Sequence, residues 1–231
     1  EEREPLGESD NTAKMKKNLQ DDNDNSIDAK EFLNARMLDM LLGDWDRHED
    51  QWRWKDRSKG KSKNYIGVPR DRDQVFHLTQ GLVPKFASRD YVLPTLRNFD
   101  PAIDHVKWVI FKTKFVNSYP EFQFSRDEVK SQAEQFKQAV TDSVIGVALK
   151  RLPQSSYDLR HDILYKKLQA RRDRLPVAMD QYYRFIQKVA DIQTSDKNEW
   201  VQITDVAGGG MNVRISKISK DGNVGEELMN K

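Results

Sequence analysis

The chain has 231 residues, of which 39 are lysine or arginine and 37 are aspartate or glutamate, so its formal net charge is +2. This near balance gives no general electrostatic case for binding nucleic acid or an anionic membrane. Because the chain contains no cysteine, disulfides, thiolate zinc sites, iron-sulfur clusters and cysteine nucleophiles are excluded. A charged ligand would have to be bound by a local cluster of polar side chains.

Length and composition indicate a folded chain with room for one large domain, or for one domain with a small appended unit. Hydrophobic residues make up 37% of the sequence and aromatic residues 10%, which argues against disorder. No apolar run approaches the roughly 20 residues that a membrane helix requires, and the first residues do not resemble a signal peptide. We expect no membrane insertion by this segment itself and no nucleic-acid partner.

The first 43 residues predict a polar segment followed by a buried helix. Residues 1–28 are rich in Asp, Asn, Glu and Lys and are expected to form a linker, in which only Thr12 to Leu19 has helical character. Asp28 is a suitable N-cap for the apolar stretch from Ala29 to Leu42, and Gly43 is a typical residue just past a helix end. Because the apolar residues of this stretch give the helix a wide apolar surface, we expect the helix to be buried.

The middle of the chain predicts a β-hairpin and then a region without clear periodicity. Aromatic and β-branched residues alternate with polar ones from Gln51 to Lys55 and from Asn64 to Val68, with a polar turn between them. Residues 77–124 carry scattered aromatics and prolines. Within them, Val106 to Phe111 is compatible with either a strand or a short helix.

The remaining sequence predicts three helices and a terminal pair of strands. Helical spacing continues from a capping box at Ser125 as far as Pro153. Two further helices are expected from Tyr157 to Arg174 and from Pro176 to Ile192, because proline is well tolerated in the first turn of a helix. Strand patterns at Trp200 to Val206 and at Met211 to Ile218 predict a C-terminal β-hairpin.

These elements predict an α+β, mainly helical fold in three parts. The parts are a polar N-terminal segment at 1–28, a helical domain carrying the first hairpin at 29–195, and a C-terminal β-hairpin extension at 196–231. In the tail, from Trp200 onward, the period of the sequence changes from helical to strand-like.

Two acidic segments carry the strongest chemical signal. The first, Gly43 to Trp52, lies between the buried helix and the hairpin, where a scaffold commonly presents polar groups to a cleft. The second, Val68 to Phe76, directly follows the hairpin. Because a hairpin brings its two ends together, the two segments are expected to face each other.

Paired acidic loops of this kind suit phosphoryl transfer. One carboxylate accepts the proton of the attacking hydroxyl, while an amide and another carboxylate hold magnesium on the phosphates. The candidate catalytic base is Asp46, and Gln51 and Asp71 are the candidate magnesium ligands, since Mg²⁺ prefers hard oxygen donors. Asp73 is a substitute ligand. The adjacent residues expected to orient the loop are Arg47 and His48.

These residues carry a resemblance to atypical kinases. Asp46-Arg47-His48, then Asp50-Gln51-Trp52, then a hairpin and Asp71, resembles the carboxy-terminal lobe of type II phosphatidylinositol 4-kinases, secretory-pathway casein kinases and HipA toxin kinases. The resemblance implies a kinase-like C-lobe in which Asp46 is catalytic and Asp71 binds metal. Gln51 stands where these families have a metal-binding asparagine.

The same resemblance implies Mg²⁺ and ATP as cofactors. It further implies a nucleotide-binding N-lobe outside this chain, because no glycine-rich loop or strand lysine precedes Asp46.

Over a longer stretch the sequence is similar to a kinase-like region of large envelope proteins of Bacteroidetes-type bacteria. In those proteins the region lies between a calcineurin-like metallophosphoesterase domain and an outer-membrane β-barrel of the surface-antigen type. The similarity implies a place in the cell envelope, in the periplasm or at the outer membrane. It also implies that neighbouring domains of a longer chain are partners of this one.

Three alternatives stay open at this point. The first is a non-catalytic pseudokinase that serves as a scaffold or interaction module beside the membrane barrel. The second is a part of a metallophosphoesterase whose active site lies on a missing domain, since Gly43 to Arg47 is one residue short of the Gly-Asp-x-x-Asp-Arg segment of those enzymes. The third and simplest is that Asp46 and Arg47 form an ordinary surface ion pair.

Overall fold

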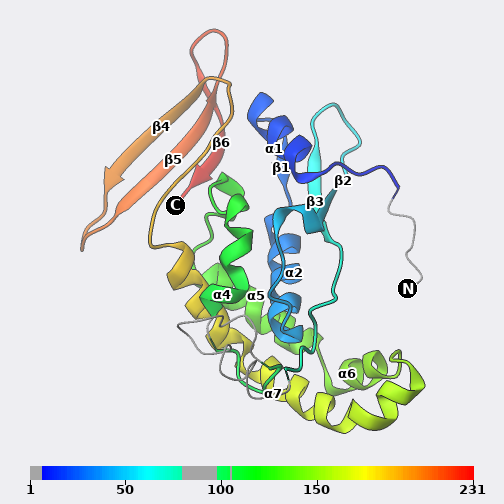
Figure 1. The fold of residues 1–231 in the computed structure, drawn as a ribbon. Helices are drawn as coiled ribbons and strands as arrows, with labels where there is room; N and C mark the ends of the chain where they lie inside the picture. Colours follow the sequence, from blue (N-terminus) through cyan, green and yellow to red (C-terminus); the bar gives the residue numbers. More distant parts are fainter. Residues whose placement is uncertain (1–6, 80–97, 105) are drawn as a thin grey trace.

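The computed structural model describes residues 7–79, 98–104 and 106–231. The fold is α+β as expected, with about half of the described residues in helices and with two small three-stranded sheets. Figure 1 shows a helical body around α2, with one sheet beside α1 and the other standing apart near the C-terminus. The helices are α1 (Thr12–Asp21), α2 (Ala29–Leu42), α4 (Val106–Ile110), α5 (Arg126–Ala139), α6 (Asp142–Leu149) and α7 (Gln154–Ile186), with 3-10 turns η1 (Glu49–Gln51), η3 (Phe111–Val116) and η4 (Pro120–Phe122). The strands are β1 (Ser26–Ile27), β2 (Trp52–Asp56), β3 (Asn64–Pro69), β4 (Glu199–Asp205), β5 (Met211–Ile218) and β6 (Val224–Asn230).

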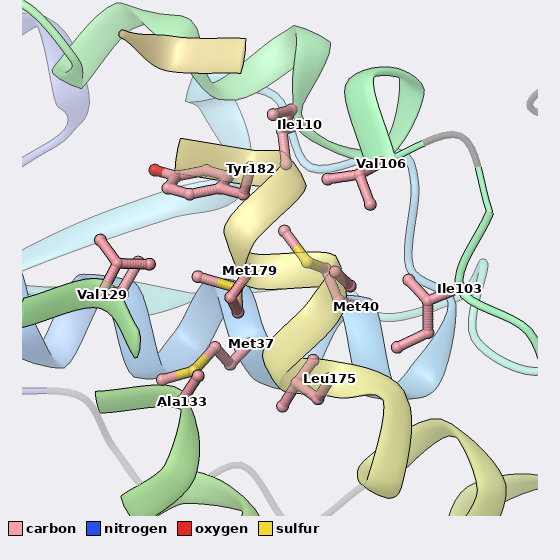
Figure 2. Close-up of a cluster of buried hydrophobic side chains, with 12 residues drawn as sticks. Met37, Met40, Ile103, Val106, Ile110, Val129, Ala133, Leu175, Met179 and Tyr182 are labelled. Carbon is pink, nitrogen blue, oxygen red and sulfur yellow. The ribbon is translucent and has the colours of Figure 1, made fainter. Parts of the chain in front are cut away.

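Helix α2 begins and ends where the sequence predicts. The Asp28 side chain accepts the backbone N–H of Glu31 at 3.0 Å, and Gly43 ends the helix in the left-handed conformation with φ 75°. Its apolar side chains pack on several sides against α4, α5 and α7 (Figure 2). Helix α2 is therefore the central element of the core, and the first acidic segment leaves directly from its C-terminal end.

Helix α7 is one continuous helix, so the prediction of two helices separated before Pro176 is wrong. Pro176 lies inside it and removes one backbone hydrogen bond, at a typical cost of about 3 kcal/mol. The neighbours Leu175, Ala178 and Met179 are all buried in the core cluster of Figure 2. Packing on both sides of the proline therefore holds the helix together where local propensity favours a break.

The region from Ser125 to Pro153 shows the opposite deviation. The predicted capping box is confirmed, because Ser125 and Glu128 bond each other's backbone N–H groups. The helix is not continuous, however, and stops at Ala139. The Thr141 hydroxyl accepts the N–H of Val144 at 3.2 Å and so starts the separate helix α6. The 106–111 segment forms helix α4 followed by η3, rather than a strand.

The predicted first hairpin is confirmed. Strands β2 and β3 pair antiparallel with Trp54 opposite Gly67, and the short β1 joins β3 in parallel. Trp52, Trp54 and Tyr65 are almost fully buried in a cluster with Phe32 of α2 and with residues of α1. The ring centroids of Phe32 and Trp52 lie 4.5 Å apart. This aromatic packing fixes the hairpin on the N-terminal half of α2 and thereby sets the positions of both acidic segments.

Replacing Gly67 by alanine is expected to destabilise the protein by about 1–3 kcal/mol, because the added methyl overpacks a closed site. Its Cβ would lie 3.1 Å from the Trp54 ring and 3.2 Å from the Trp52 ring, and neither indole has room to move. Urea unfolding measures the change. Gly60→Ala is the matched control, since a Cβ there meets no atom within 4 Å. Equal stability of the two variants would contradict this packing.

The C-terminal strands form a three-stranded antiparallel sheet in the order β4-β5-β6, not the two-stranded hairpin expected. The predicted pair is present as β4 and β5. Strand β6 was missed because its sequence, Val-Gly-Glu-Glu-Leu-Met-Asn, contains residues that disfavour strands. The boundaries predicted at residues 28 and 195 stay predictions.

None of the helices within the described ranges combines the length and the apolar character needed to cross a bilayer.

Candidate functional site

The first hairpin brings the two acidic segments together. Its outermost pair is Trp52 opposite Pro69, so the residues just outside the pair are neighbours. The N–H of Arg70 donates to the carbonyl of Gln51 at 2.7 Å, which extends the pairing by one step. Residues 43–51 and residues 70–73 therefore meet at the open end of the hairpin, next to the C-terminal end of α2.

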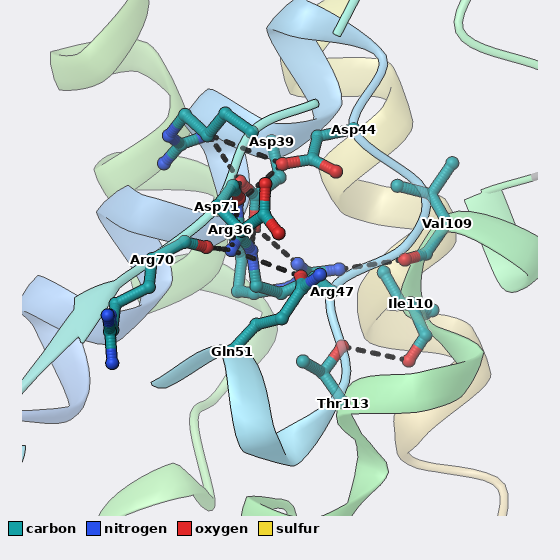
Figure 3. A network of polar contacts seen from close by, with 11 residues as sticks. Arg36, Asp39, Asp44, Arg47, Gln51, Arg70, Asp71, Val109, Ile110 and Thr113 are labelled. Atoms are coloured by element: carbon teal, nitrogen blue, oxygen red, sulfur yellow. Dashed lines mark hydrogen bonds and ion pairs between the residues drawn. The ribbon is translucent and has the colours of Figure 1, made fainter. Parts of the chain in front are cut away.

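Arg47 joins these two segments through its side chain, which has no exposed surface. Its Nη1 donates to Gln51 Oε1 at 3.3 Å, to the Asp71 carbonyl at 2.9 Å and to the Arg70 carbonyl (Figure 3). The Gln51 amide oxygen and the Asp71 carbonyl oxygen thus accept hydrogen bonds from the same nitrogen, Arg47 Nη1. A charge-assisted bond to two backbone carbonyls is strong enough to fix the path of the second segment.

The other face of the Arg47 guanidinium belongs to a buried ionic cluster, which we call the Arg47 network. Nε and Nη2 donate to the two carboxylate oxygens of Asp39 at 3.2 and 3.1 Å, and Nη2 also donates to Asp44 at 2.5 Å. Asp39 in addition accepts bonds of 2.5 Å from both Arg36 and Arg72. The network therefore balances three guanidinium groups against two carboxylates.

Burial is the largest influence on the pKa values of two groups in the Arg47 network, Asp44 and Arg36. Desolvation raises the pKa of Asp44, and the nearby Arg47 charge opposes that rise. Desolvation likewise lowers the pKa of Arg36, whose nearest compensating charge is Asp39. Each charge in the network depends on the others remaining in place.

Asp46 lies at the rim of this arrangement and not within it. Its carboxylate pairs with Lys112, from η3, and the two side chains are 24% and 36% exposed. The Lys112 ammonium also lies 5.1 Å from the centroid of the Trp45 ring. The alternative of a surface ion pair between Asp46 and Arg47 is wrong, because Arg47 is buried and Asp46 has another partner. The Asp46 carboxylate is accessible to a ligand.

Asp71 and Asp73 lie on one exposed turn. The Asp71 carboxylate accepts the N–H of Asp73 at 3.3 Å, as in an Asx-turn. Asp71 has φ 53° and Phe76 has φ 55°, and they are the only non-glycine residues with positive φ in the described part of the chain. Aspartate tolerates the left-handed region, whereas a phenylalanine there is uncommon and strained, and strained positions cluster at functional sites. The second acidic segment therefore ends at Phe76 in an unfavourable conformation that the surrounding contacts impose.

The donor set fits magnesium by atom type. Gln51 contributes an amide oxygen, and Asp71 and Asp73 contribute carboxylates on one turn. Gln51 Oε1 already accepts a bond from the Arg47 cation, so the two exposed carboxylates are the better placed ligands. Neither here nor elsewhere in the described ranges do three or more His, Asp or Glu side chains form a group that could hold a metal ion. His48, predicted to orient the loop, lies 3.8 Å from Asp50, and its side chain is 40% exposed.

Several residues of the site were not found from the sequence. Arg36 and Asp39 carried a signal, because they are charged residues spaced i, i+3 within an apolar helix. Arg72 lies within the second acidic segment and was given no role there, yet it binds Asp39. Lys112 carried no signal, since it is 66 residues from Asp46 and lies in a segment without clear periodicity.

Comparison with known proteins adds no family to this description: no family model matches the chain, and neither a curated protein nor a solved structure matches it.

Proposed function

We propose that this chain is the kinase-like C-lobe of a magnesium-dependent phosphotransferase of the bacterial cell envelope. Asp46 acts as the general base toward the acceptor hydroxyl, and Asp71 and Asp73 hold Mg²⁺ on the phosphates of ATP. The observation that supports this best is the position of Arg47. One buried guanidinium connects the segment that carries Asp46 with the turn that carries Asp71 and Asp73.

In this proposal each neighbour of Asp46 has a supporting role. Lys112 holds the Asp46 carboxylate at the rim through an accessible ion pair, and an acceptor hydroxyl would take over part of that contact. The buried charges of Asp39 and Asp44 keep Arg47 in one orientation. Arg47 is thus a positioning residue, because none of its nitrogens faces solvent. The nucleotide-clamping N-lobe would come from another segment of a longer chain.

A non-catalytic scaffold is the second candidate, and one contact favours it. Gln51 stands where the resembling kinases have a metal-binding asparagine, and its oxygen is engaged by Arg47. A site that keeps its internal bonds in place of a metal ligand is what a degenerate kinase would show. The two candidates differ in whether Mg²⁺ binds together with nucleotide.

Titration calorimetry with Mg²⁺ in the presence of ATP separates the two candidates. The longer protein that contains this chain and its N-lobe is expected to bind, and Asp71→Asn is expected to weaken binding by about 10- to 100-fold, because it removes a charged ligand. Asparagine tolerates positive φ, so the turn should persist. Asp50→Asn is the control, since the Asp50 side chain is 89% exposed and lies outside the turn. If no protein gives metal-dependent heat, or if all three proteins give the same heat, the result would favour the non-catalytic scaffold.

A further inference from the structure

Strand β4 is an open edge of the C-terminal sheet. Among the residues that the structure describes it pairs only with β5, and Figure 1 shows it on the side of the sheet away from the helical body. The bonds Ile218 N–H to Asn198 and Val206 N–H to Gly210 fix which residues face β5. They are the even-numbered ones, so the backbone groups of residues 199, 201, 203 and 205 point outward. A further strand can pair with this row.

The edge carries few of the features that normally protect a strand from pairing. Its centre, Trp-Val-Gln-Ile-Thr, has no charge and no proline, and the register between β4 and β5 is unbroken. The irregularities of the sheet lie between β5 and β6 instead. Protective charges occur only at the two ends of β4. The edge is therefore open to an added strand over its central residues.

An apolar stripe crosses the sheet and reaches this edge. Ile215 and Met229 are opposite each other and buried at the inner side of the sheet, where β6 contacts η4. The stripe continues on the same face to Val201, opposite Ile215, and to Ile203, opposite Val213. Val201 and Ile203 are 52% and 61% exposed. The face that packs inside the molecule thus extends outward without a cover.

The charges of the edge favour a second copy of the same chain. In an antiparallel pair centred on Val201, Asp205 of each copy lies in register with Lys197 of the other, which sits in a bend two residues before β4, so the long lysine side chain can reach the carboxylate in two opposite-charge pairs. A pair centred on Gln202 would instead place Glu199 opposite Asp205, which is repulsive. The Glu199 carboxylate already has partners within its own chain, since it accepts hydrogen bonds from the Ser195 hydroxyl at 2.6 Å and from the Asn23 amide at 3.1 Å. Electrostatics therefore selects the first register.

We propose that two copies of this chain associate through β4, pairing antiparallel about Val201 to form one continuous six-stranded sheet. The two apolar stripes then join across the seam. This inference does not depend on the phosphotransfer proposal, because the edge contains none of the candidate catalytic or metal-binding residues. The contact is small, so the dimer is expected to be reversible and to need high concentration.

Sedimentation over about 1 µM to 1 mM protein tests the association. The average mass is expected to rise toward twice the 27.0 kDa of one chain. Asp205→Lys, which makes both end pairs repulsive, is expected to weaken the dimer by about fivefold or more, and the charge-swapped double variant Lys197→Asp/Asp205→Lys should restore it. A monomer at every concentration, or a double variant as weak as the single one, would overturn the proposal.

A cysteine cross-link tests the register, since the chain has no cysteine of its own. Val201→Cys places two thiols opposite each other at a Cα separation of about 5.5 Å, within disulfide range. With oxidised glutathione as the oxidant, this variant is expected to form a disulfide dimer faster than Gln202→Cys, which would face Trp200. Val224→Cys on β6, at a side chain 52% exposed, measures random collision. Cross-linking at 201 no faster than at 224 would sink the proposed pairing.

Discussion

Replacing Arg47 by methionine is expected to lower the free energy of unfolding by about 3–5 kcal/mol, because it removes one partner from a buried ionic cluster. Of the ion pairs that Asp44 forms with described residues, only the one with Arg72 would remain, at 3.8 Å between Arg72 Nη1 and Asp44 Oδ2. The Arg70 and Asp71 carbonyls would lose their bonds to Nη1 as well. Urea unfolding of the whole chain measures the loss.

The matched control is Arg70→Met. The backbone carbonyl of Arg70 accepts a hydrogen bond from Arg47, but the Arg70 side chain is exposed. Replacing this side chain is expected to change the free energy of unfolding by no more than about 0.5 kcal/mol. A loss below about 1 kcal/mol for Arg47→Met would show that the Arg47 network does not hold the two segments together.

The destabilisation of Arg47→Met should shrink as the pH falls. Burial raises the pKa of Asp44 in the folded protein above its unfolded value, and Arg47 limits that rise. Without Arg47 the folded pKa rises further. The folded state then binds a proton that the unfolded state lacks, so stability increases on acidification through that pKa. An Arg47→Met deficit that is constant from neutral to acidic pH would contradict this assignment to Asp44.

Asp46→Asn is expected to reduce magnesium-dependent phosphoryl transfer by about 10²- to 10⁴-fold, the range for losing a general base. The assay uses the protein that contains this chain, with ATP as donor. Stability should change by no more than about 1 kcal/mol, because the lost ion pair with Lys112 is partly exposed. Folding and catalysis are thus affected separately.

Asp50→Asn controls for charge in the same loop and is expected to keep activity within a few-fold. Lys112→Met adds a further arm, since it releases Asp46 without removing the carboxylate. A wild-type protein without transfer activity, or an Asp46→Asn variant with near-normal activity, would refute the assignment of Asp46 as the base.

Short sequence patterns predicted those features of the fold that depend on residues close together in the chain. The limits of α2 follow from an N-cap at Asp28 and a left-handed Gly43, both readable from a few residues. The first hairpin follows from strict alternation on either side of a polar turn. Its geometry then brings the two acidic segments together, so the approximate place of the candidate site was also accessible from the sequence.

Long-range contacts account for what could not be predicted. Asp39 and Arg72 are 33 residues apart, and Arg47 reaches the carbonyl of residue 71, so no local pattern indicates the Arg47 network. The break expected at Pro176 was wrong because packing against α2 and α5 outweighs the local cost of the proline. In both cases tertiary structure determines the outcome.

The unbroken course of α7 couples distant parts of the molecule. At about 1.5 Å per residue its 33 residues span roughly 50 Å. Leu164 and Leu168 on its first half pack with α6, while Leu175 and Met179 on its second half pack with α2 and α5. One continuous helix therefore belongs to two hydrophobic clusters at once, and the helical body should melt as a single cooperative unit.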